Sequence, residues 1–301
     1  MESKRLIIRG DDLGVTHSVN QGYRKMAEKG VISAWSIMAP CSWFPEAVKV
    51  SKEFPEVDLG MHLTLMSEWE AYRWSPVLGA GCVPSLVDKD GYFFSNPIDL
   101  LANKPKIEEV EAELRAQIER VINSGLELRY IDNSHGNILH MSPMINKVAN
   151  KLTSEYGLQV SPFVFDPNLE IVSSAAPTAE AKQEAMLKWL AAPAAAPGYR
   201  FLCMHAMEDT DEQKALKLPP EIAIPFLQDM VYHNIADTNA VTADGFLDKV
   251  YDLGYELTRY RDLPEAEILK ELPVWPKEIV AQMFTMMGSS PEVIQQVTSM
   301  E

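Results

Sequence analysis

Five polar side chains lie where the predicted β-strands end, and their types suit the binding of a metal ion. They are Asp11 and Asp12 at the end of the first strand, His62 on the third, His135 after the fourth and His205 at the end of the sixth. In barrels of alternating strands and helices, groups at the C-terminal ends of the strands form the active site. Carboxylate and imidazole groups bind Zn²⁺ and related divalent ions, with water in the open positions. The set therefore predicts one divalent ion, Zn²⁺ or Mg²⁺.

Asp11 and Asp12 stand next to each other in the stretch Gly10-Asp11-Asp12-Leu13-Gly14. Two neighbouring carboxylates repel each other unless a cation or a proton relieves the charge. One of them could bind metal while the other acts as a base. The alternative is that both cap a helix that begins near Thr16. His62 alone is compatible with a satisfied core histidine, and His135 with a surface residue, but their joint placement at strand ends favours the functional interpretation.

The elements that must position these groups alternate between strands and helices. Apolar runs of strand length alternate with segments of helical period, which is typical of a parallel sheet with helical crossovers. We expect a repeating α/β fold with about seven parallel strands. The predicted strands are Leu6–Arg9, Val31–Met38, Val57–Leu65, Leu126–Asp132, Leu158–Phe165, Arg200–His205 and Tyr255–Tyr260. Ser142 and Pro143 predict the start of one helix, and Thr242 is expected to cap another.

Two segments interrupt this alternation. Glu68–Lys104 is rich in aromatic residues, proline and glycine, and we interpret it as a long loop beside the site. Trp69, Tyr72 and Trp74 in this loop are candidate substrate-binding residues that stack on a sugar, with core packing as the alternative. The sequence predicts a barrel over residues 1–265 and an accessory helical segment of the same domain over residues 266–301.

Composition excludes several classes of partner. The 301 residues are 47% apolar, so the chain can bury a substantial core, and the formal net charge of −16 opposes binding to nucleic acids or anionic membranes. No export signal or membrane span is evident, which favours a cytoplasmic location, and a homodimer is compatible with the pattern. The three scattered cysteines predict buried free thiols rather than disulfides.

Three motifs resemble those of the YdjC/ChbG-like carbohydrate deacetylases, in the same order and with the same spacing. They are Arg9-Gly10-Asp11-Asp12-Leu13-Gly14 with Ser18-Val19-Asn20, then Asp58-Leu59-Gly60-Met61-His62-Leu63-Thr64-Leu65, and then Ile131-Asp132-Asn133-Ser134-His135. Arg261-Asp262-Leu263 is similar to the family's closing strand and turn. The resemblance covers roughly residues 5 to 263.

The resemblance implies a distorted TIM-like barrel that uses a divalent metal to hydrolyse the N-acetyl group of an amino sugar or chito-oligosaccharide. By matching motif positions, it implies that Asp12, His62 and His135 are the metal ligands and that Asp11 is the catalytic base. His205 matches the late histidine that assists the leaving group or the oxyanion.

Two other functions remain open at this stage. Two histidines and one carboxylate also form the facial triad of non-haem Fe(II) oxygenases, although that triad normally sits in a β-sandwich. A sugar-binding protein without catalysis is the second alternative. Asn133, which lengthens the third motif by one residue, and Ala206, which replaces a usual proline, depart from the family pattern.

Overall fold

Seven parallel β-strands form one sheet in the computed structural model, which describes residues 4–133, 137–161, 178–193, 199–220, 229–286 and 290–298. The strands are β1 Lys4–Leu13, β2 Ala34–Ile37, β3 Asp58–Leu63, β4 Tyr130–Asn133, β5 Gln159–Val160, β6 Tyr199–Met204 and β7 Tyr255–Leu257. Their order is β5-β4-β3-β2-β1-β6, and β7 pairs with the beginning of β1. The predicted α/β class and seven strands are confirmed. Closure of a barrel between β5 and β6 stays a prediction.

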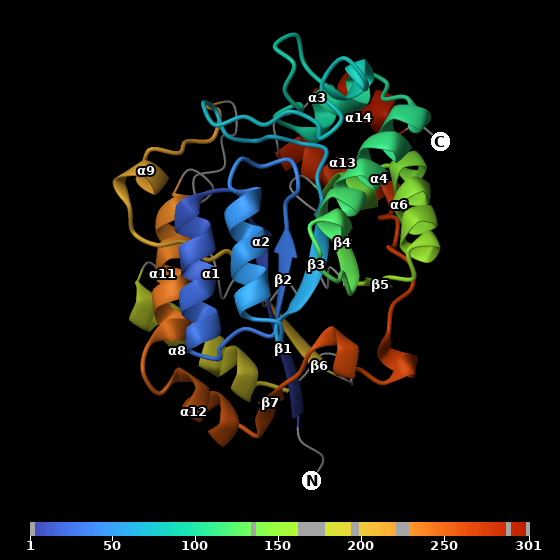
Figure 1. Ribbon diagram of the computed structural model, residues 1–301. Helices are drawn as coiled ribbons and strands as arrows, with labels where there is room; N and C mark the ends of the chain where they lie inside the picture. The colour runs from blue at the N-terminus through green and yellow to red at the C-terminus, as the bar shows by residue number, and fades with distance from the viewer. Residues whose placement is uncertain are drawn as a thin grey trace.

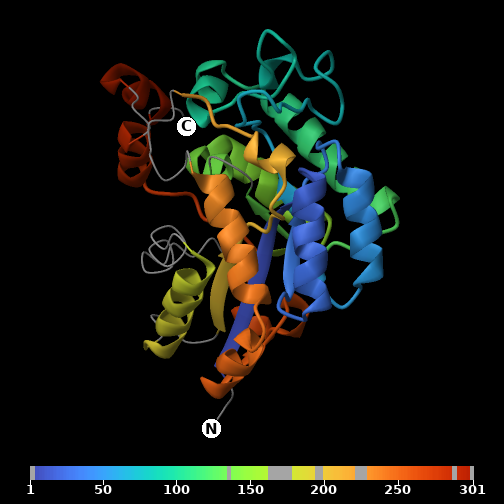
Figure 2. The ribbon, with the colours of Figure 1, turned by 90° about the vertical axis from the view of Figure 1, so that its left-hand side faces the viewer.

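Helices follow most strands and pack around the sheet (Figure 1). The longer ones are α1 His17–Glu28, α2 Phe44–Glu53, α4 Ile107–Asn123, α6 Pro143–Glu155, α8 Ala179–Ala191 and α11 Met230–Thr242. α8 and α11 lie side by side (Figure 2). The helix starts follow from local chemistry, because the side chains of Thr16, Ser142 and Thr178 each accept a hydrogen bond from the backbone N–H three residues later. The predicted start at Ser142 and Pro143 is confirmed.

The two faces of the sheet carry different side chains. On β1, Leu6 and Ile8 belong to the main hydrophobic core, whereas Ile7 belongs to a smaller cluster with Ala34, Tyr130, Phe201, Tyr260 and Leu263. Residues two positions further along a strand return to the same face. The residues that follow this cluster on the same face, toward the strands' C-terminal ends, are therefore Arg9, Ser36, Asp132 and Cys203. The smaller cluster, which we call the apolar floor, thus lies beneath these four residues, which we call the polar layer.

Gly60 on β3 makes room for this floor. A Cβ atom at Gly60 would lie 2.1 Å from Cε2 of Tyr130 on the neighbouring strand, so a larger residue would displace the tyrosine ring. The Tyr130 hydroxyl is 2.9 Å from Ser36 Oγ, which in turn donates to Asp132 Oδ2 at 2.6 Å. The floor therefore supports the polar layer above it through direct hydrogen bonds.

The chain after β7 returns to both ends of the sheet. At the start of β3, the buried carboxylate of Asp58 accepts hydrogen bonds from the backbone and the side chain of Arg261. Arg261 lies in the 3-10 helix η3 Tyr260–Asp262. Helices α13 Lys277–Met286 and α14 Pro291–Thr298 lie at the end to which the strands point, where α14 packs against α3 Pro97–Ala102 (Figure 1). The division at residue 265 stays a prediction.

Two local predictions are wrong. Thr242 caps no helix, because it is the last residue of α11 and its hydroxyl donates to Thr238 O within that helix. The next helix, α12 Phe246–Asp252, begins instead after Gly245, whose φ of 76° lies in the left-handed region. Cys82 is exposed rather than buried, since it lies in the loop after β3. Within the described parts of the chain, every helix is too short or too polar to cross a bilayer.

Candidate metal centre

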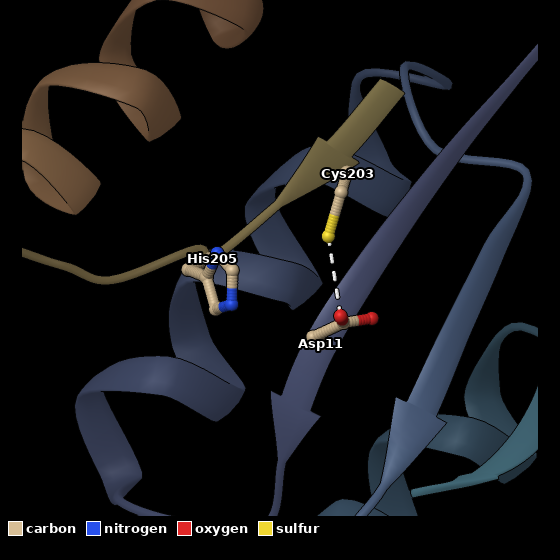
Figure 3. Close-up of side chains that lie close together, drawn as sticks. All are labelled: Asp11, Cys203 and His205. Atoms are coloured by element: carbon tan, nitrogen blue, oxygen red, sulfur yellow. Dashed lines mark hydrogen bonds between the residues drawn. The ribbon is translucent and has the colours of Figure 1, made fainter. Parts of the chain in front are cut away.

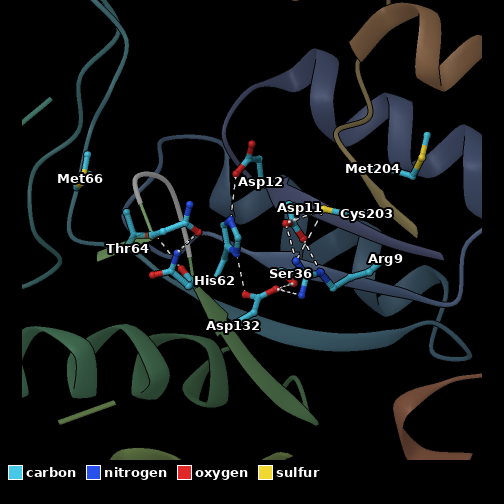
Figure 4. A network of polar contacts seen from close by, with 12 residues as sticks. Arg9, Asp11, Asp12, Ser36, His62, Thr64, Met66, Asp132, Cys203 and Met204 are labelled. Carbon is cyan, nitrogen blue, oxygen red and sulfur yellow. Dashed lines mark hydrogen bonds and ion pairs between the residues drawn. The ribbon is translucent and has the colours of Figure 1, made fainter. Parts of the chain in front are cut away.

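The end of β1 brings two consecutive carboxylates to one region. In a regular strand, Asp11 and Asp12 would point to opposite faces. Here the pairing with β2 is irregular between Gly10 and Leu13, and Asp12 has a φ of 70°. Aspartate tolerates this left-handed conformation better than most residues. As a result, Asp12 Oδ1 lies 3.3 Å from Nε2 of His62, on the side where Asp11 also lies (Figure 4).

His62 is held between two carboxylates. Its Nδ1 lies 2.7 Å from Asp132 Oδ1, and its Nε2 faces Asp12. Since an ionised carboxylate only accepts hydrogen bonds, Nδ1 carries the proton that is donated to Asp132. A histidine that donates one ring N–H to a carboxylate while the other nitrogen faces a ligand site is the usual arrangement for metal-binding histidines. Asp132 is therefore a positioning residue for His62.

Arg9 contacts the carboxylates of both Asp11 and Asp132. Its Nε and Nη2 donate to Oδ1 and Oδ2 of Asp11, both at 2.7 Å, in a bidentate pair. Its Nη1 lies 2.9 Å from Asp132 Oδ2 and donates to Ser161 Oγ at 2.5 Å. Arg9, Asp11 and Asp132 are all buried. One guanidinium thus orients the carboxylate predicted to act as base and the carboxylate that holds His62.

The buried charges shift one another's pKa values. Burial alone would raise the pKa of Asp132, but the charges of Arg9 and His62 outweigh burial and lower it. Burial would lower the pKa of His62, but Asp132 and Asp11 raise it to about 10. The carboxylates therefore hold a positive charge at the ring of His62, and the same field would attract a metal cation in place of the proton.

The donor pair of Asp12 and His62 fits a divalent ion. Two ligands at about 2.0 and 2.1 Å from a tetrahedral Zn²⁺ lie about 3.4 Å apart. The observed separation of Asp12 Oδ1 and His62 Nε2 is 3.3 Å. Asp11, His62 and Asp132 also bring donor atoms within 4.8 Å of one another. We favour the Asp12 side, because Nδ1 of His62 is already bonded to Asp132. His135, the third predicted ligand, lies outside the described residues.

His205 follows β6 and reaches the other side of Asp11. One donor atom from each of three groups lies within 4.8 Å of the others: the ring of His205, the thiol of Cys203 and the carboxylate of Asp11. Cys203 Sγ donates to Asp11 Oδ2 at 3.1 Å. Burial raises the pKa of Cys203, and the negative charge of Asp11 adds to this effect. The thiol is therefore protonated beside Asp11, and His205 lies close to the carboxylate that is the predicted base.

The aromatic candidates lie in different environments. Trp69 and Trp74 are each 4% exposed and belong to the main core, and Trp74 Nε1 donates to Met66 O at 2.8 Å. Tyr72 is half-buried, and its hydroxyl donates to Val15 O. The burial of the two tryptophans favours the packing alternative for them. A role in substrate binding stays a prediction, for which Tyr72 has the most accessible ring.

The sequence analysis assigned no role to Arg9, Cys203 or Ser161. Their positions in the sequence could have indicated Arg9 and Cys203. Arg9 lies two residues before Asp11, and Cys203 lies two residues before His205. Alternation then places Arg9 with Asp11, and Cys203 with His205, on one face. Ser161 carried no such signal, since its bond to Arg9 spans 152 positions of the chain.

Comparison with known proteins decides the family. The family model described as YdjC-like protein matches residues 5–273. The chain belongs to the YdjC-like family. A carbohydrate deacetylase of Brevibacillus brevis is 36% identical over 162 residues, and one of Listeria monocytogenes serotype 4b is 32% identical over 158 residues. These alignments span 54% and 52% of this chain but only 60% of each relative.

Solved structures share the fold of this YdjC-like chain. A protein of Enterococcus faecalis V583, to which cleavage of cellobiose phosphate has been ascribed, superposes with a TM-score of 0.65 at 24% identity. The match covers 86% of this chain and 98% of that one. A deacetylase called T48, solved with its substrate, gives a TM-score of 0.51 at 14% identity, with 91% and 97% of the two chains covered. At these identities the likeness establishes the fold alone.

Proposed function

We propose that this protein is a metal-dependent carbohydrate deacetylase that hydrolyses the N-acetyl group of an amino sugar or chito-oligosaccharide. The observation that carries the proposal is the pair of Asp12 and His62, separated by 3.3 Å, with Asp132 behind the histidine and Asp11 beside it. This arrangement combines a donor pair for a divalent ion with a second carboxylate that can accept a proton. Membership of the YdjC-like family and the deacetylase relatives support the same chemistry.

Asp12, His62 and His135 are the proposed ligands. When bound, a divalent ion such as Zn²⁺ or Mg²⁺ supplies the Lewis acidity that polarises the amide carbonyl and activates water. Asp12 and His62 have the separation that this binding requires. Asp132 fixes the ring of His62, so Nε2 faces Asp12, and the proton on Nε2 would be replaced by a bound ion.

Asp11 is the proposed general base. Its bidentate pair with Arg9 holds the carboxylate in one orientation beside the proposed ligands. A positioned base of this kind typically contributes about 10²- to 10⁴-fold to the rate. His205, on the opposite side of Asp11 from His62, is the proposed donor of the proton that the departing sugar amine requires.

The α/β fold argues against the Fe(II) oxygenase alternative, whose triad normally sits in a β-sandwich. Acetate release distinguishes the proposed hydrolase from a sugar-binding protein without catalysis. The net charge of −16 is compatible with a neutral N-acetylated substrate in either case. A cytoplasmic location and a homodimer are further proposals that rest on the sequence.

Acetate release from a panel of N-acetylated sugars tests the proposal. The protein is treated with a chelator, and each aliquot is then refilled with one divalent ion. We expect acetate release only after refilling, and none from a His62→Ala variant. His17→Ala is the matched control, because His17 is a half-exposed histidine paired with Glu46, and this variant should remain active. Sugar binding without acetate release from any refilled sample would contradict the proposal.

A further inference from the structure

Three donor groups of different chemistry converge on the side of Asp11 that faces away from His62. They are the carboxylate of Asp11 on β1, the thiol of Cys203 on β6 and the imidazole of His205 just after β6 (Figure 3). Their donor atoms all lie within 4.8 Å of one another. Neither ring nitrogen of His205 forms a hydrogen bond with the residues that the structure describes, so the imidazole is available as a ligand.

We infer that Asp11, Cys203 and His205 form a second site that binds a soft divalent ion such as Zn²⁺, separate from the site at Asp12 and His62. Three protein ligands and a water molecule complete the four-coordinate geometry that Zn²⁺ adopts in open sites. Two of these residues are partly accessible, which gives the ion a path from solvent. This site goes beyond the single ion of the proposed function.

The contact between Cys203 and Asp11 has the dimensions of a ligand pair. A sulfur at about 2.3 Å and an oxygen at about 2.0 Å from a tetrahedral Zn²⁺ lie about 3.5 Å apart. The observed distance between Cys203 Sγ and Asp11 Oδ2 is 3.1 Å, with the thiol proton between them. Replacement of this proton by Zn²⁺ needs only a small outward movement of the sulfur, and one proton is released to solvent for each ion bound.

The charges around the site can accommodate the ion. The Asp11 carboxylate and the Cys203 thiolate together neutralise one Zn²⁺, while Arg9 keeps its pair with Asp132 at 2.9 Å. Asp11 Oδ2 already accepts from Arg9, but a carboxylate oxygen has a second lone pair, which the thiol now occupies. Thiolate ligands select zinc and other soft ions over Mg²⁺. The second site should therefore bind Zn²⁺ but not Mg²⁺, whereas the first site could bind either ion.

Occupation of the second site has a consequence that rests on the proposed function. Asp11 is the proposed base and His205 the proposed acid, and both become ligands of the second ion. Excess Zn²⁺ should then inhibit acetate release, whereas excess Mg²⁺ should not. Zinc availability would then regulate the deacetylase activity through Asp11 and His205.

Metal counting tests the inference without reference to activity. Chelated protein is dialysed against Zn²⁺, and bound zinc is measured by elemental analysis for the wild type, Cys203→Ser and the matched control Cys82→Ser. Cys82 is an exposed cysteine in the loop after β3. We expect two zinc ions per chain in the wild type and in Cys82→Ser, but one in Cys203→Ser. Loss of this direct ligand should weaken the second site by more than the roughly 10- to 100-fold that loss of a ligand's partner causes.

Cobalt substitution identifies the ligand. Co²⁺ bound by a thiolate has a characteristic charge-transfer absorption, which we expect in the wild type, in Cys82→Ser and in His62→Ala, but not in Cys203→Ser. His205→Gln, which alters an accessible residue after the strand, should also lose the second ion and serves if Cys203→Ser fails to fold. A wild-type protein that binds one zinc and shows no thiolate absorption would overturn the inference. Acetate release by that same protein would leave the proposed function intact. Two zinc ions per chain, together with no acetate release from protein refilled with Mg²⁺, would refute only the function.

Discussion

Replacement of Arg9 by methionine should destabilise the protein strongly and in a pH-dependent way. Methionine has a similar length but no charge, so the substitution leaves the carboxylates of Asp11 and Asp132 buried without the cation that both contact. Removing one partner of a buried ion pair typically costs about 3–5 kcal/mol. We expect this cost near neutral pH, and not twice this value, because the two pairs share one guanidinium and their contributions are not additive.

The pH dependence follows from the pKa of Asp132. In the wild type this pKa is lowered, so Asp132 contributes stability above its unfolded pKa of about 3.9, and the contribution is lost as the pH falls through the folded pKa. In Arg9→Met the pKa of Asp132 should rise, and this contribution diminishes or changes sign. The difference in unfolding free energy between the two proteins should therefore be small at about pH 4 and grow toward about pH 7.

Urea denaturation of the metal-free proteins at several pH values measures this difference. Arg24→Met is the control, because Arg24 forms a partly exposed pair with Glu53, and such pairs contribute only about 0–1 kcal/mol. Arg9→Lys should recover part of the stability, since lysine keeps the charge but not the bidentate geometry. If Arg9→Met costs no more than Arg24→Met at every pH, then Arg9 does not hold the polar layer together and the reasoning is wrong.

Three further substitutions test the surroundings of the site. Asp132→Asn should lower metal affinity about 10- to 100-fold in equilibrium dialysis, because the amide holds His62 less firmly; unchanged affinity would exclude a positioning role. Trp74→Ala should reduce the unfolding free energy by about 3–5 kcal/mol, as expected for a core tryptophan, whereas Tyr72→Ala should mainly raise KM for the sugar. Unaltered stability of Trp74→Ala would refute core packing, and an unaltered KM for Tyr72→Ala would remove it from the substrate site.

Local patterns predicted most of the fold. Strict alternation in Asp58–Leu63 identified β3 and placed His62 on the face opposite the main core, and the helix start at Ser142 followed from its capping side chain. Thr242 misled because a threonine hydroxyl bonds equally well to a carbonyl one turn earlier inside a helix. The local sequence alone therefore does not tell whether such a threonine caps the next helix or lies inside the preceding one.

The site was only partly predictable, because its decisive contacts are long-range. The sequence indicated Asp11, Asp12, His62 and His205, but the irregular end of β1 that lets Asp11 and Asp12 share one side depends on pairing with β2. A buried arginine on a strand also contradicts the usual exposure of charged residues. Only the fold shows that Arg9 is compensated by Asp132, which lies more than a hundred residues later in the sequence.

Metal content and acetate release, measured on the same samples of Asp11→Asn and Asp12→Asn, test the central claim most directly. Asparagine tolerates the left-handed backbone at Asp12, so neither substitution should disturb the fold through strain. Asp11→Asn should keep its ion at the Asp12 site while turnover falls by about 10²- to 10⁴-fold. Asp12→Asn should lose metal affinity and regain some activity when excess Mg²⁺ is supplied. Loss of this ion by Asp11→Asn with retention by Asp12→Asn, or full activity of both variants, would contradict the assignment.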